Sequence, residues 1–231
     1  MQIEGKFTGA SIFANTIEPE TIEQVKRVCD HPIFRDCSIK VMPDCHAGAG
    51  CVIGFTSDMP HNGEIIPNII GVDQSCGMYV VKLEESSLLN DYEKLDKVIR
   101  EHVPCGFDGR DVVSKDIPED LYEDVRRIST DILKDNYVTH LKKIGSLGGG
   151  NHFISIEKGE TGTYLIIHSG SRNFGNKLAI HFQSIANEKH CYGEGVLKTL
   201  SYIDGKDAEE YLKCAEDASF IKRRKEKMKE R

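Results

Sequence analysis

The pattern of apolar residues and glycines along this chain distinguishes the expected helices from the expected strands. Between residues 18 and 30 the apolar side chains repeat every three or four positions, as they do on one face of a helix. The same period predicts further helices at residues 87–102, 118–134 and 176–190, and the beginning of another at 207–212. We therefore expect helices that each bury one face.

Short β-branched runs between glycines predict the strands. Residues 38–81 are rich in glycine and poor in helix formers, which is typical of strands joined by tight loops. After the second helix we expect a glycine-dense loop at 145–152, strands at 153–156 and 163–168, and a turn at 169–175. Strands that alternate with helices predict an α/β fold with a mixed α+β layout.

Length and composition limit the class of protein. The 231 residues, 39% of them hydrophobic, are enough for a sizeable core in one large domain or two small ones. No apolar run approaches the ~20 residues that span a membrane, and residues 1–10 lack the pattern of a signal peptide. We therefore expect a cytoplasmic protein without a membrane partner. The net charge of −7 does not favour nucleic-acid binding, but a local basic patch could still provide it.

Eight cysteines would suggest disulfides in a small secreted chain. Here the chain is longer and no secretion signal is recognised, so we expect free thiols, most of them buried as small apolar side chains. No Cys-x-x-Cys pair occurs, and a structural zinc ribbon is therefore not expected.

Four residues of metal-ligand type lie beside turn glycines or at the ends of expected strands. Asp73 and Cys76 are three positions apart, His152 follows three glycines and an asparagine, and His168 ends an apolar strand. Each alone is more simply explained as a structural residue, but together they form a reasonable four-ligand set. Ligand softness favours zinc, and the mixed oxygen, nitrogen and sulfur donors also suit manganese or iron.

A phosphate site is predicted at the turn 169–175. Ser171 and Arg172 precede the helix expected from Asn176, so a hydroxyl, a guanidinium and backbone N–H groups could converge on an anion. The alternative is an ordinary turn in which Arg172 is solvated. The glycine-rich segment 145–150 lacks the Lys-Ser/Thr ending of a Walker loop, which excludes that motif.

Four motifs together resemble the RtcB family of RNA-splicing ligases in their order and approximate spacing. They are Met42-Pro43-Asp44-Cys45-His46-Ala47-Gly48, Gly71-Val72-Asp73-x-x-Cys76-Gly77-Met78, Gly145-Ser146-Leu147-Gly148-Gly149-Gly150-Asn151-His152-Phe153, and His168-Ser169-Gly170-Ser171-Arg172. The resemblance runs from about residue 5 to about residue 212. It implies a layered fold of mixed sheets with helices.

The resemblance also implies a function. Members of the family join RNA ends that carry a 2′,3′-cyclic phosphate or 3′-phosphate to a 5′-hydroxyl, as in tRNA halves or broken RNA. They use GTP and two manganese ions, and they pass through a guanylate attached to a histidine. Carried over by motif, the implied metal ligands are Asp73, Cys76, His152 and His168, with the Cys76 thiolate bridging the ions. The residues implied to contact nucleotide or phosphate are Asn151, Ser171 and Arg172. The resemblance also implies that Asp44 and His46 border the active site.

Two departures from the family pattern affect these expectations. Gln74-Ser75 stand where the family usually has Ile followed by Gly or Asn, and Ser could strain a turn that needs a positive φ. No histidine follows His190, so no residue matches the guanylate-accepting histidine. We therefore expect an incomplete ligase domain over residues 1–217, with its C-terminal part missing and no activity on its own. Residues 218–231 would form a charged tail, disordered or foreign to the family.

Two other classes of function stay open. The chain could be a non-catalytic paralogue that binds metal or RNA, as the missing acceptor suggests. It could also be an unrelated metallohydrolase that shares only the loop chemistry. The need for an activating protein is a separate open question.

Overall fold

The computed structural model describes residues 1–71, 73–74, 76–84 and 91–218. Within these residues the chain divides into two compact units. Unit 1 comprises Met1–Val72 and Leu178–Lys213, and unit 2 comprises Asp73–Lys177 with the residues from Cys214 onward. The expected tail at 218–231 lies outside the described residues, apart from Ala218.

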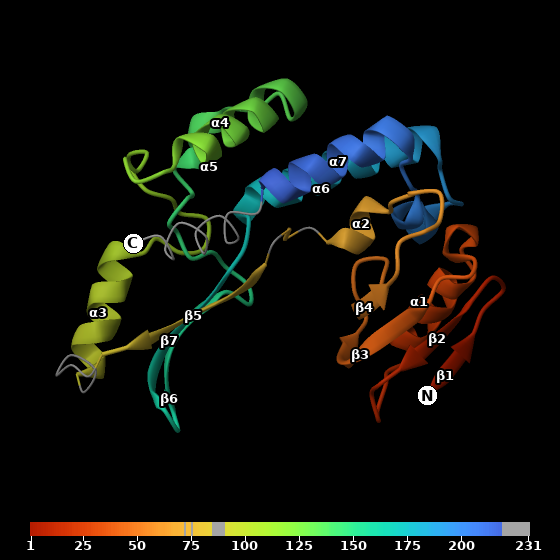
Figure 1. Ribbon diagram of the computed structural model, residues 1–231, viewed down its shortest axis with the longest axis horizontal. Coiled ribbons are helices and arrows are strands. Elements are labelled where there is room, and N and C mark those ends of the chain that lie inside the picture. Colours follow the sequence, from red (N-terminus) through yellow and green to blue (C-terminus); the bar gives the residue numbers. More distant parts are fainter. Residues whose placement is uncertain (72, 75, 85–90, 219–231) are drawn as a thin grey trace. The chain divides into compact units, whose positions relative to one another are not determined.

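Unit 1 is built on a four-stranded mixed sheet (Figure 1). Its strands are β1 (Gln2–Glu4), β2 (Gly9–Ile12), β3 (Ile39–His46) and β4 (Ile53–Ser57), in that spatial order. The β1/β2 and β3/β4 pairs are antiparallel, whereas β2 and β3 are parallel. A parallel pair needs a crossover connection, and the helix α1 provides it.

Helix α1 (Pro19–Cys29) confirms the helix that the sequence predicts at residues 18–30. Pro19 stands in its first turn, where the missing N–H removes no helical hydrogen bond. Val25, Val28 and Cys29 are almost fully buried on the face toward the sheet, against Ile39 and Val41 of β3. The 3.6-residue period therefore identified the face that forms the core of unit 1.

Unit 1 also contains further helical segments. They are the short α2 (Pro67–Ile70), the 3-10 turns η1 (Pro32–Phe34) and η4 (Gly195–Leu200), and most of α6 (Arg172–Lys189) and α7 (Gly205–Asp217). On α6 the predicted inward residues Leu178, Phe182 and Ala186 are fully buried. Helix α2 corrects the expectation of strands alone over 38–81, because Pro67 begins a helical turn there.

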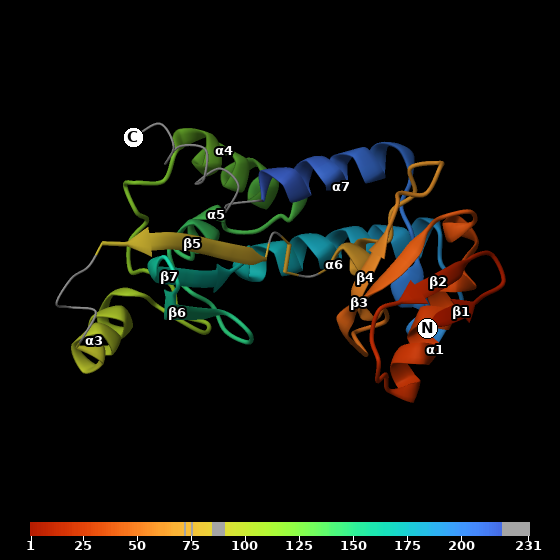
Figure 2. The ribbon, with the colours of Figure 1, turned by 60° about the horizontal axis from the view of Figure 1, so that its bottom comes forward.

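Unit 2 contains a three-stranded antiparallel sheet in the order β5-β7-β6 (Figure 2). Strand β5 (Gly77–Leu83) and strand β6 (Phe153–Gly159) both pair with the central β7 (Gly162–Ser169). The strands expected at 153–156 and 163–168 are thus confirmed, each slightly longer than predicted. With helices and mixed sheets in the described residues, the predicted α/β class is also confirmed.

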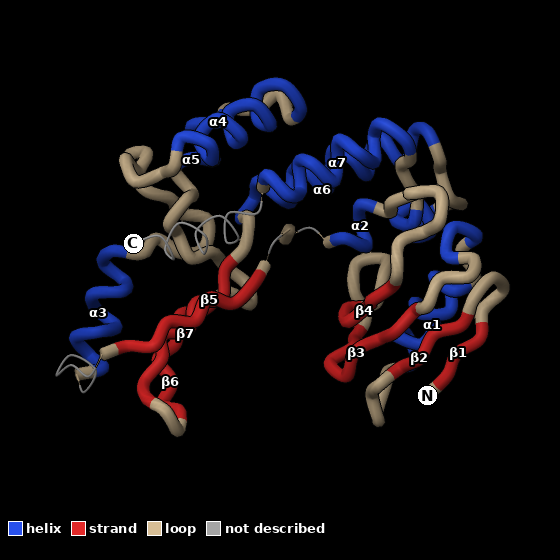
Figure 3. Tube along the Cα trace, in the orientation of Figure 1, coloured by secondary structure: helices blue, strands red, loops and turns tan. Residues whose placement is uncertain are grey.

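Four helical segments accompany this sheet (Figure 3). They are α3 (Tyr92–His102), α4 (Glu119–Arg127), the π-helical turn η3 (Ile128–Ile132) and α5 (Tyr137–Leu141). Together α4 and η3 account for the helix predicted at 118–134. The first residues of the helix predicted at 87–102 lie outside the described part of the chain, and α3 has no buried side chain.

The turn predicted at 169–175 is wrong in its second half. Helix α6 begins at Arg172, four residues before the predicted start at Asn176. The reason is tertiary: Phe174 is buried to 2% exposure, and its ring lies 5.0 Å from the His140 ring. Packing of this ring outweighs the weak helix propensity of Asn173 and Gly175.

Among the helices in the described ranges, none combines the length and apolar character needed to cross a membrane.

Protonation of His31 should destabilise unit 1 as the pH falls. The ring is fully buried; Nε2 donates to the Leu200 carbonyl at 3.0 Å, and Nδ1 accepts from the Ile33 N–H at 3.2 Å. Burial lowers the pKa of His31 from 6.5 to about 4. Below pH 6.5 the unfolded chain therefore binds a proton that the folded chain resists, and this stability is lost as the pH falls toward 4.

We expect His31 alone to lower the free energy of unfolding by about 2 kcal/mol between pH 7 and pH 5. Urea unfolding at both pH values measures this change. In His31→Asn the change in unfolding free energy between the two pH values should be smaller by that amount. The control His61→Asn, at an exposed position, should show the same change as wild type. Equal pH dependence in all three proteins would contradict the assignment.

Candidate metal centre

The antiparallel sheet of unit 2 brings three of the predicted ligands to one of its ends. Cys76 directly precedes β5, and His152 directly precedes β6. His168 lies near the end of β7 and pairs with both Met78 of β5 and Phe153 of β6. Because β5 and β6 begin where the antiparallel β7 ends, residues from distant parts of the sequence meet there.

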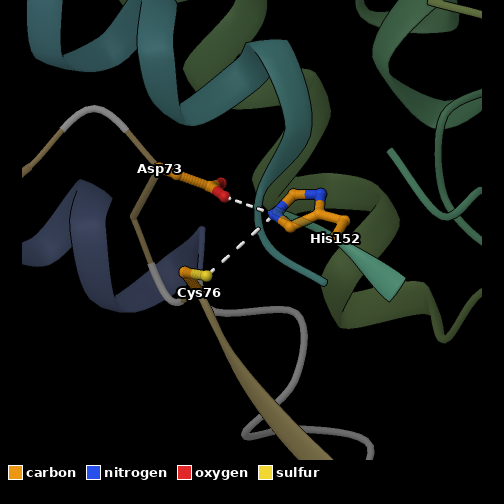
Figure 4. Close-up of side chains that lie close together, drawn as sticks. All are labelled: Asp73, Cys76 and His152. Carbon is orange, nitrogen blue, oxygen red and sulfur yellow. Dashed lines mark hydrogen bonds and ion pairs between the residues drawn. The ribbon is translucent and has the colours of Figure 1, made fainter. Parts of the chain in front are cut away.

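The donor atoms of Asp73, Cys76 and His152 lie close together (Figure 4). His152 Nε2 is 2.6 Å from Asp73 Oδ2 and 4.0 Å from Cys76 Sγ. The donor atoms of Asp73, Cys76 and His152 all lie within 4.8 Å of one another. His168 Nε2 is 2.7 Å from Cys76 Sγ, so the fourth predicted ligand joins the same cluster through the thiol. Their roles as ligands stay a prediction.

A tight turn and the start of α6 hold the Asp73 side chain in place. The Cys76 N–H donates to the Asp73 carbonyl at 3.1 Å, which closes the turn between them. Asp73 Oδ1 accepts from the Ser171 N–H at 3.1 Å and from its hydroxyl at 3.4 Å. A Cβ on Gly170 would lie 2.2 Å from Asp73 Oδ1, so this approach requires glycine at 170.

Gly148 is a second glycine that the cluster requires. Its φ is +111°, a conformation that residues with a side chain rarely adopt. A Cβ there would lie 2.1 Å from His152 Nδ1 and 2.0 Å from a guanidinium nitrogen of Arg172. Gly148 therefore lets the His152 ring and the Arg172 head group pack against the same stretch of backbone.

The chemistry of the donors fits a divalent transition-metal ion. A carboxylate oxygen, a thiol sulfur and imidazole nitrogens form the mixed set that manganese, iron or zinc accepts. Burial raises the pKa of the Cys76 thiol, and the Asp73 charge and its hydrogen bond raise it further. A bound cation would reverse this tendency, because it favours the thiolate. His152 directs Nε2 at Asp73 and Cys76, while its Nδ1 is buried without a partner among the described residues.

The two residues predicted to bind phosphate make hydrogen bonds within unit 2. Ser171 is 1% exposed, and both of its donors contact Asp73. Arg172 donates from Nε to Ser146 Oγ at 3.2 Å and from Nη2 to the Gly106 carbonyl at 2.6 Å. Its φ of +61° is strained for a residue with a side chain. Burial lowers the pKa of Arg172, although the nearby Asp73 charge opposes that shift.

A cavity of about 270 Å³ lies against the sheet of unit 2, on the face opposite to the His168 side chain. Tyr79, Ile154 and Ile167, which are cross-strand neighbours, form part of its wall. Arg172 and Lys143 are the cationic residues that line it. Gly145, Ser146 and Leu147 of the glycine loop line the cavity as well, so Arg172 and this loop belong to the same wall.

The other predicted site residues are distributed over both units. Asn151 is exposed and directly precedes His152 in unit 2. Asp44 and His46 lie on β3 in unit 1, where His46 Nδ1 is 2.9 Å from the Asp44 carbonyl. Their predicted position at the border of the site stays a prediction.

The sequence prediction did not identify Ser146, Gly148 and Gly170 as contacts of the site. All three belong to the quoted glycine-rich motifs, and that was the available signal. Their partners are set by the fold: Ser146 by a residue 26 positions away, Gly170 by Asp73 in the turn before β5. Only tertiary structure could therefore show what each of them touches.

Comparison with known proteins agrees with this set of motifs. The family model described as tRNA-splicing ligase RtcB matches residues 24–223. The RNA-splicing ligase RtcB of Escherichia coli K12 is 31% identical over 87% of this chain and 50% of that relative. The tRNA-splicing ligase RtcB of Methanococcus maripaludis is 25% identical over 79% of the chain and 47% of the relative.

The matched segment covers most of the chain and includes all four motifs, so this protein is a member of a ligase family. The chain belongs to the RtcB family of tRNA-splicing ligases. It spans about half the length of the curated relatives it matches.

Substitution of Gly148 should disturb the metal centre, whereas substitution of its neighbour should not. A Cβ at 148 collides with His152 and Arg172, but a Cβ at Gly149 meets only the Gly106 Cα at an ordinary 3.5 Å. We expect Gly148→Ala to weaken divalent-metal affinity by roughly 10- to 100-fold, as displaced supporting contacts do. Gly149→Ala is the matched control. Titration calorimetry measures both, and equal affinities in the two variants would refute the role of Gly148.

Proposed function

We propose that this chain carries the metal-binding and nucleotide-binding part of an RNA ligase. The reaction is the joining of RNA ends with a 2′,3′-cyclic phosphate or 3′-phosphate to 5′-hydroxyl ends, with GTP and manganese. The observation that carries the proposal is the cluster of Asp73, Cys76 and His152 donor atoms within 4.8 Å, in a chain of the RtcB family. Broken RNA or tRNA halves in the cytoplasm would be the substrates.

Asp73, Cys76, His152 and His168 would hold the manganese. When bound, the metal would offset negative charge on the phosphates and make phosphorus more electrophilic. The other contribution of the protein is to hold these ligands in position. Ser171 directs the Asp73 carboxylate toward the cluster with two hydrogen bonds. Cys76 is the one sulfur donor of the set, and its contact with His168 places it between the two imidazoles.

Nucleotide contacts are proposed on the glycine loop. Asn151 is exposed beside His152, so its side-chain amide is available to a phosphate or to GTP. Arg172 fixes this loop through Ser146 and the adjoining backbone through Gly106. These bonds leave further N–H donors on its guanidinium for a phosphate oxygen. We propose that Ser171 acts through Asp73, because both of its donors contact that carboxylate.

A second candidate function is a non-catalytic protein that binds metal or RNA. The observation behind it is that none of the nine histidines of this chain stands in a motif that matches the guanylate acceptor of the family. Both candidates share the metal centre. They differ in whether this chain itself accepts a guanylate.

Removal of the Asp73 carboxylate should abolish tight manganese binding. Asp73 provides the negatively charged oxygen of the cluster, and Mn²⁺ prefers oxygen donors. We expect Asp73→Ala to weaken Mn²⁺ binding at least tenfold in titration calorimetry, while Asp116→Ala, an exposed carboxylate elsewhere in unit 2, leaves it unchanged. If wild type and Asp73→Ala take up Mn²⁺ equally, the proposed centre is wrong.

Incubation with α-labelled GTP and Mn²⁺ separates the two candidate functions. We expect no covalent guanylate on this chain, because none of its histidines matches the acceptor. Denaturing electrophoresis followed by autoradiography measures it, with a relative of full length as the positive control. A labelled band that survives denaturation would exclude the non-catalytic reading and would identify an acceptor that the motifs do not reveal.

A further inference from the structure

Phe107 is the most exposed large apolar side chain in the described part of the chain. Its exposed fraction is 99%, so the ring makes almost no contact with the protein. Single exposed apolar residues are common and need no explanation on their own. Phe107 differs because the backbone around it is hydrogen-bonded, cationic side chains lie near it, and its loop is connected to the candidate metal centre.

The backbone around this ring is held by hydrogen bonds along its whole length. We call residues 104–110 the Phe107 loop. The Leu147 N–H donates to the Pro104 carbonyl, the Gly106 N–H to the Gly148 carbonyl, and the Arg110 N–H to the Lys142 carbonyl, each at 2.8 Å. The Lys143 ammonium donates to the carbonyl of Phe107 itself. These bonds hold the backbone that carries the exposed ring.

The same contacts connect the loop to the metal centre. The Gly106 carbonyl accepts from Arg172, and the Gly106 N–H donates to Gly148. Gly148 in turn packs so closely on the His152 ring that no side chain fits between them. Phe107 therefore follows Gly106, whose N–H is bonded to Gly148, the glycine that contacts the candidate ligand His152.

Positive charge surrounds the base of the loop. Arg110 is exposed and its Nη2 donates to the Gly145 carbonyl at 3.3 Å, while Lys142 and Lys143 lie on the segment that supports the loop. Asp108 and Asp111 are the acidic residues nearby in the sequence, and both are exposed. An exposed aromatic ring next to arginine and lysine is the combination that binds single-stranded nucleic acid: the ring stacks on a base and the cations contact phosphates.

We propose that Phe107 is a stacking platform for one base of the RNA strand whose end reaches the metal centre. This inference rests on the proposed function, since it takes RNA as the substrate. A protein contact would favour a wider apolar patch, whereas within residues 106–110 the one apolar side chain is Phe107, among two glycines, Asp108 and Arg110. Arg110 and Lys143 would contact the phosphates that flank the stacked base.

The test uses the whole chain with Mn²⁺ and a single-stranded RNA oligonucleotide that has a 3′-phosphate and 2-aminopurine as its last base. Fluorescence anisotropy gives the affinity, and quenching of 2-aminopurine reports stacking. Phe107→Ala and Phe107→Leu should each weaken binding about tenfold and remove the quenching, because leucine keeps apolar bulk but has no π face. Phe107→Tyr should behave like wild type.

Tyr92→Ala is the matched control, since Tyr92 is a 71% exposed aromatic residue on α3 in the same unit. Tyr92→Ala should change neither the RNA affinity from anisotropy nor the 2-aminopurine quenching, and all variants should bind Mn²⁺ like wild type. The platform is wrong if Phe107→Ala binds this RNA as tightly as wild type, or if Phe107→Leu retains full affinity. A dimer in size-exclusion chromatography that Phe107→Ala dissociates, with RNA affinity unchanged, would identify a protein contact instead. If wild type and all variants fail to bind the RNA, the proposed RNA function fails together with the platform.

Discussion

The architecture of unit 2 depends on one constraint: the donor atoms of a carboxylate, a thiol and an imidazole lie within 4.8 Å of one another, and a second imidazole contacts the thiol. These groups come from a turn, from the starts of two strands and from the end of a third. Polar groups so close together are stable only if each is oriented by the surrounding structure. Ser171 orients Asp73, and the antiparallel pairing sets the positions of Cys76, His152 and His168.

Two glycines let the backbone lie close to the side chains of the candidate metal centre. At Gly148 and Gly170 a single added carbon would collide with His152 or Asp73. Arg172 then links the glycine loop to the start of α6, at the cost of a left-handed backbone conformation. Strain of this kind persists where the neighbouring contacts determine the conformation, and here those contacts support the candidate metal centre. The Phe107 loop is attached to the same network through Gly106.

The helical period of apolar residues predicted the longer helices, and β-branched runs between glycines predicted β6 and β7; neither pattern predicted β1, β2 or α5. Val25, Val28 and Cys29 recur at helical spacing and form the inner face of α1, so the pattern and the packing agree. The start of α6 could not be read in this way, because the burial of Phe174 against His140 extends the helix through residues with weak propensity. The four ligand candidates were recognisable by residue type beside glycines. The contacts of Ser171 and Arg172 depend on partners far away in the sequence, and no local pattern encodes them.

The sulfur of Cys76 distinguishes this centre from a generic site made of oxygen and nitrogen donors. X-ray absorption at the manganese K-edge, on the chain saturated with Mn²⁺, measures directly whether sulfur is bound to the metal. The account predicts a sulfur scatterer among the ligands of the wild-type protein and its loss in Cys76→Ser. Manganese surrounded only by oxygen and nitrogen in the wild-type chain would contradict the central claim.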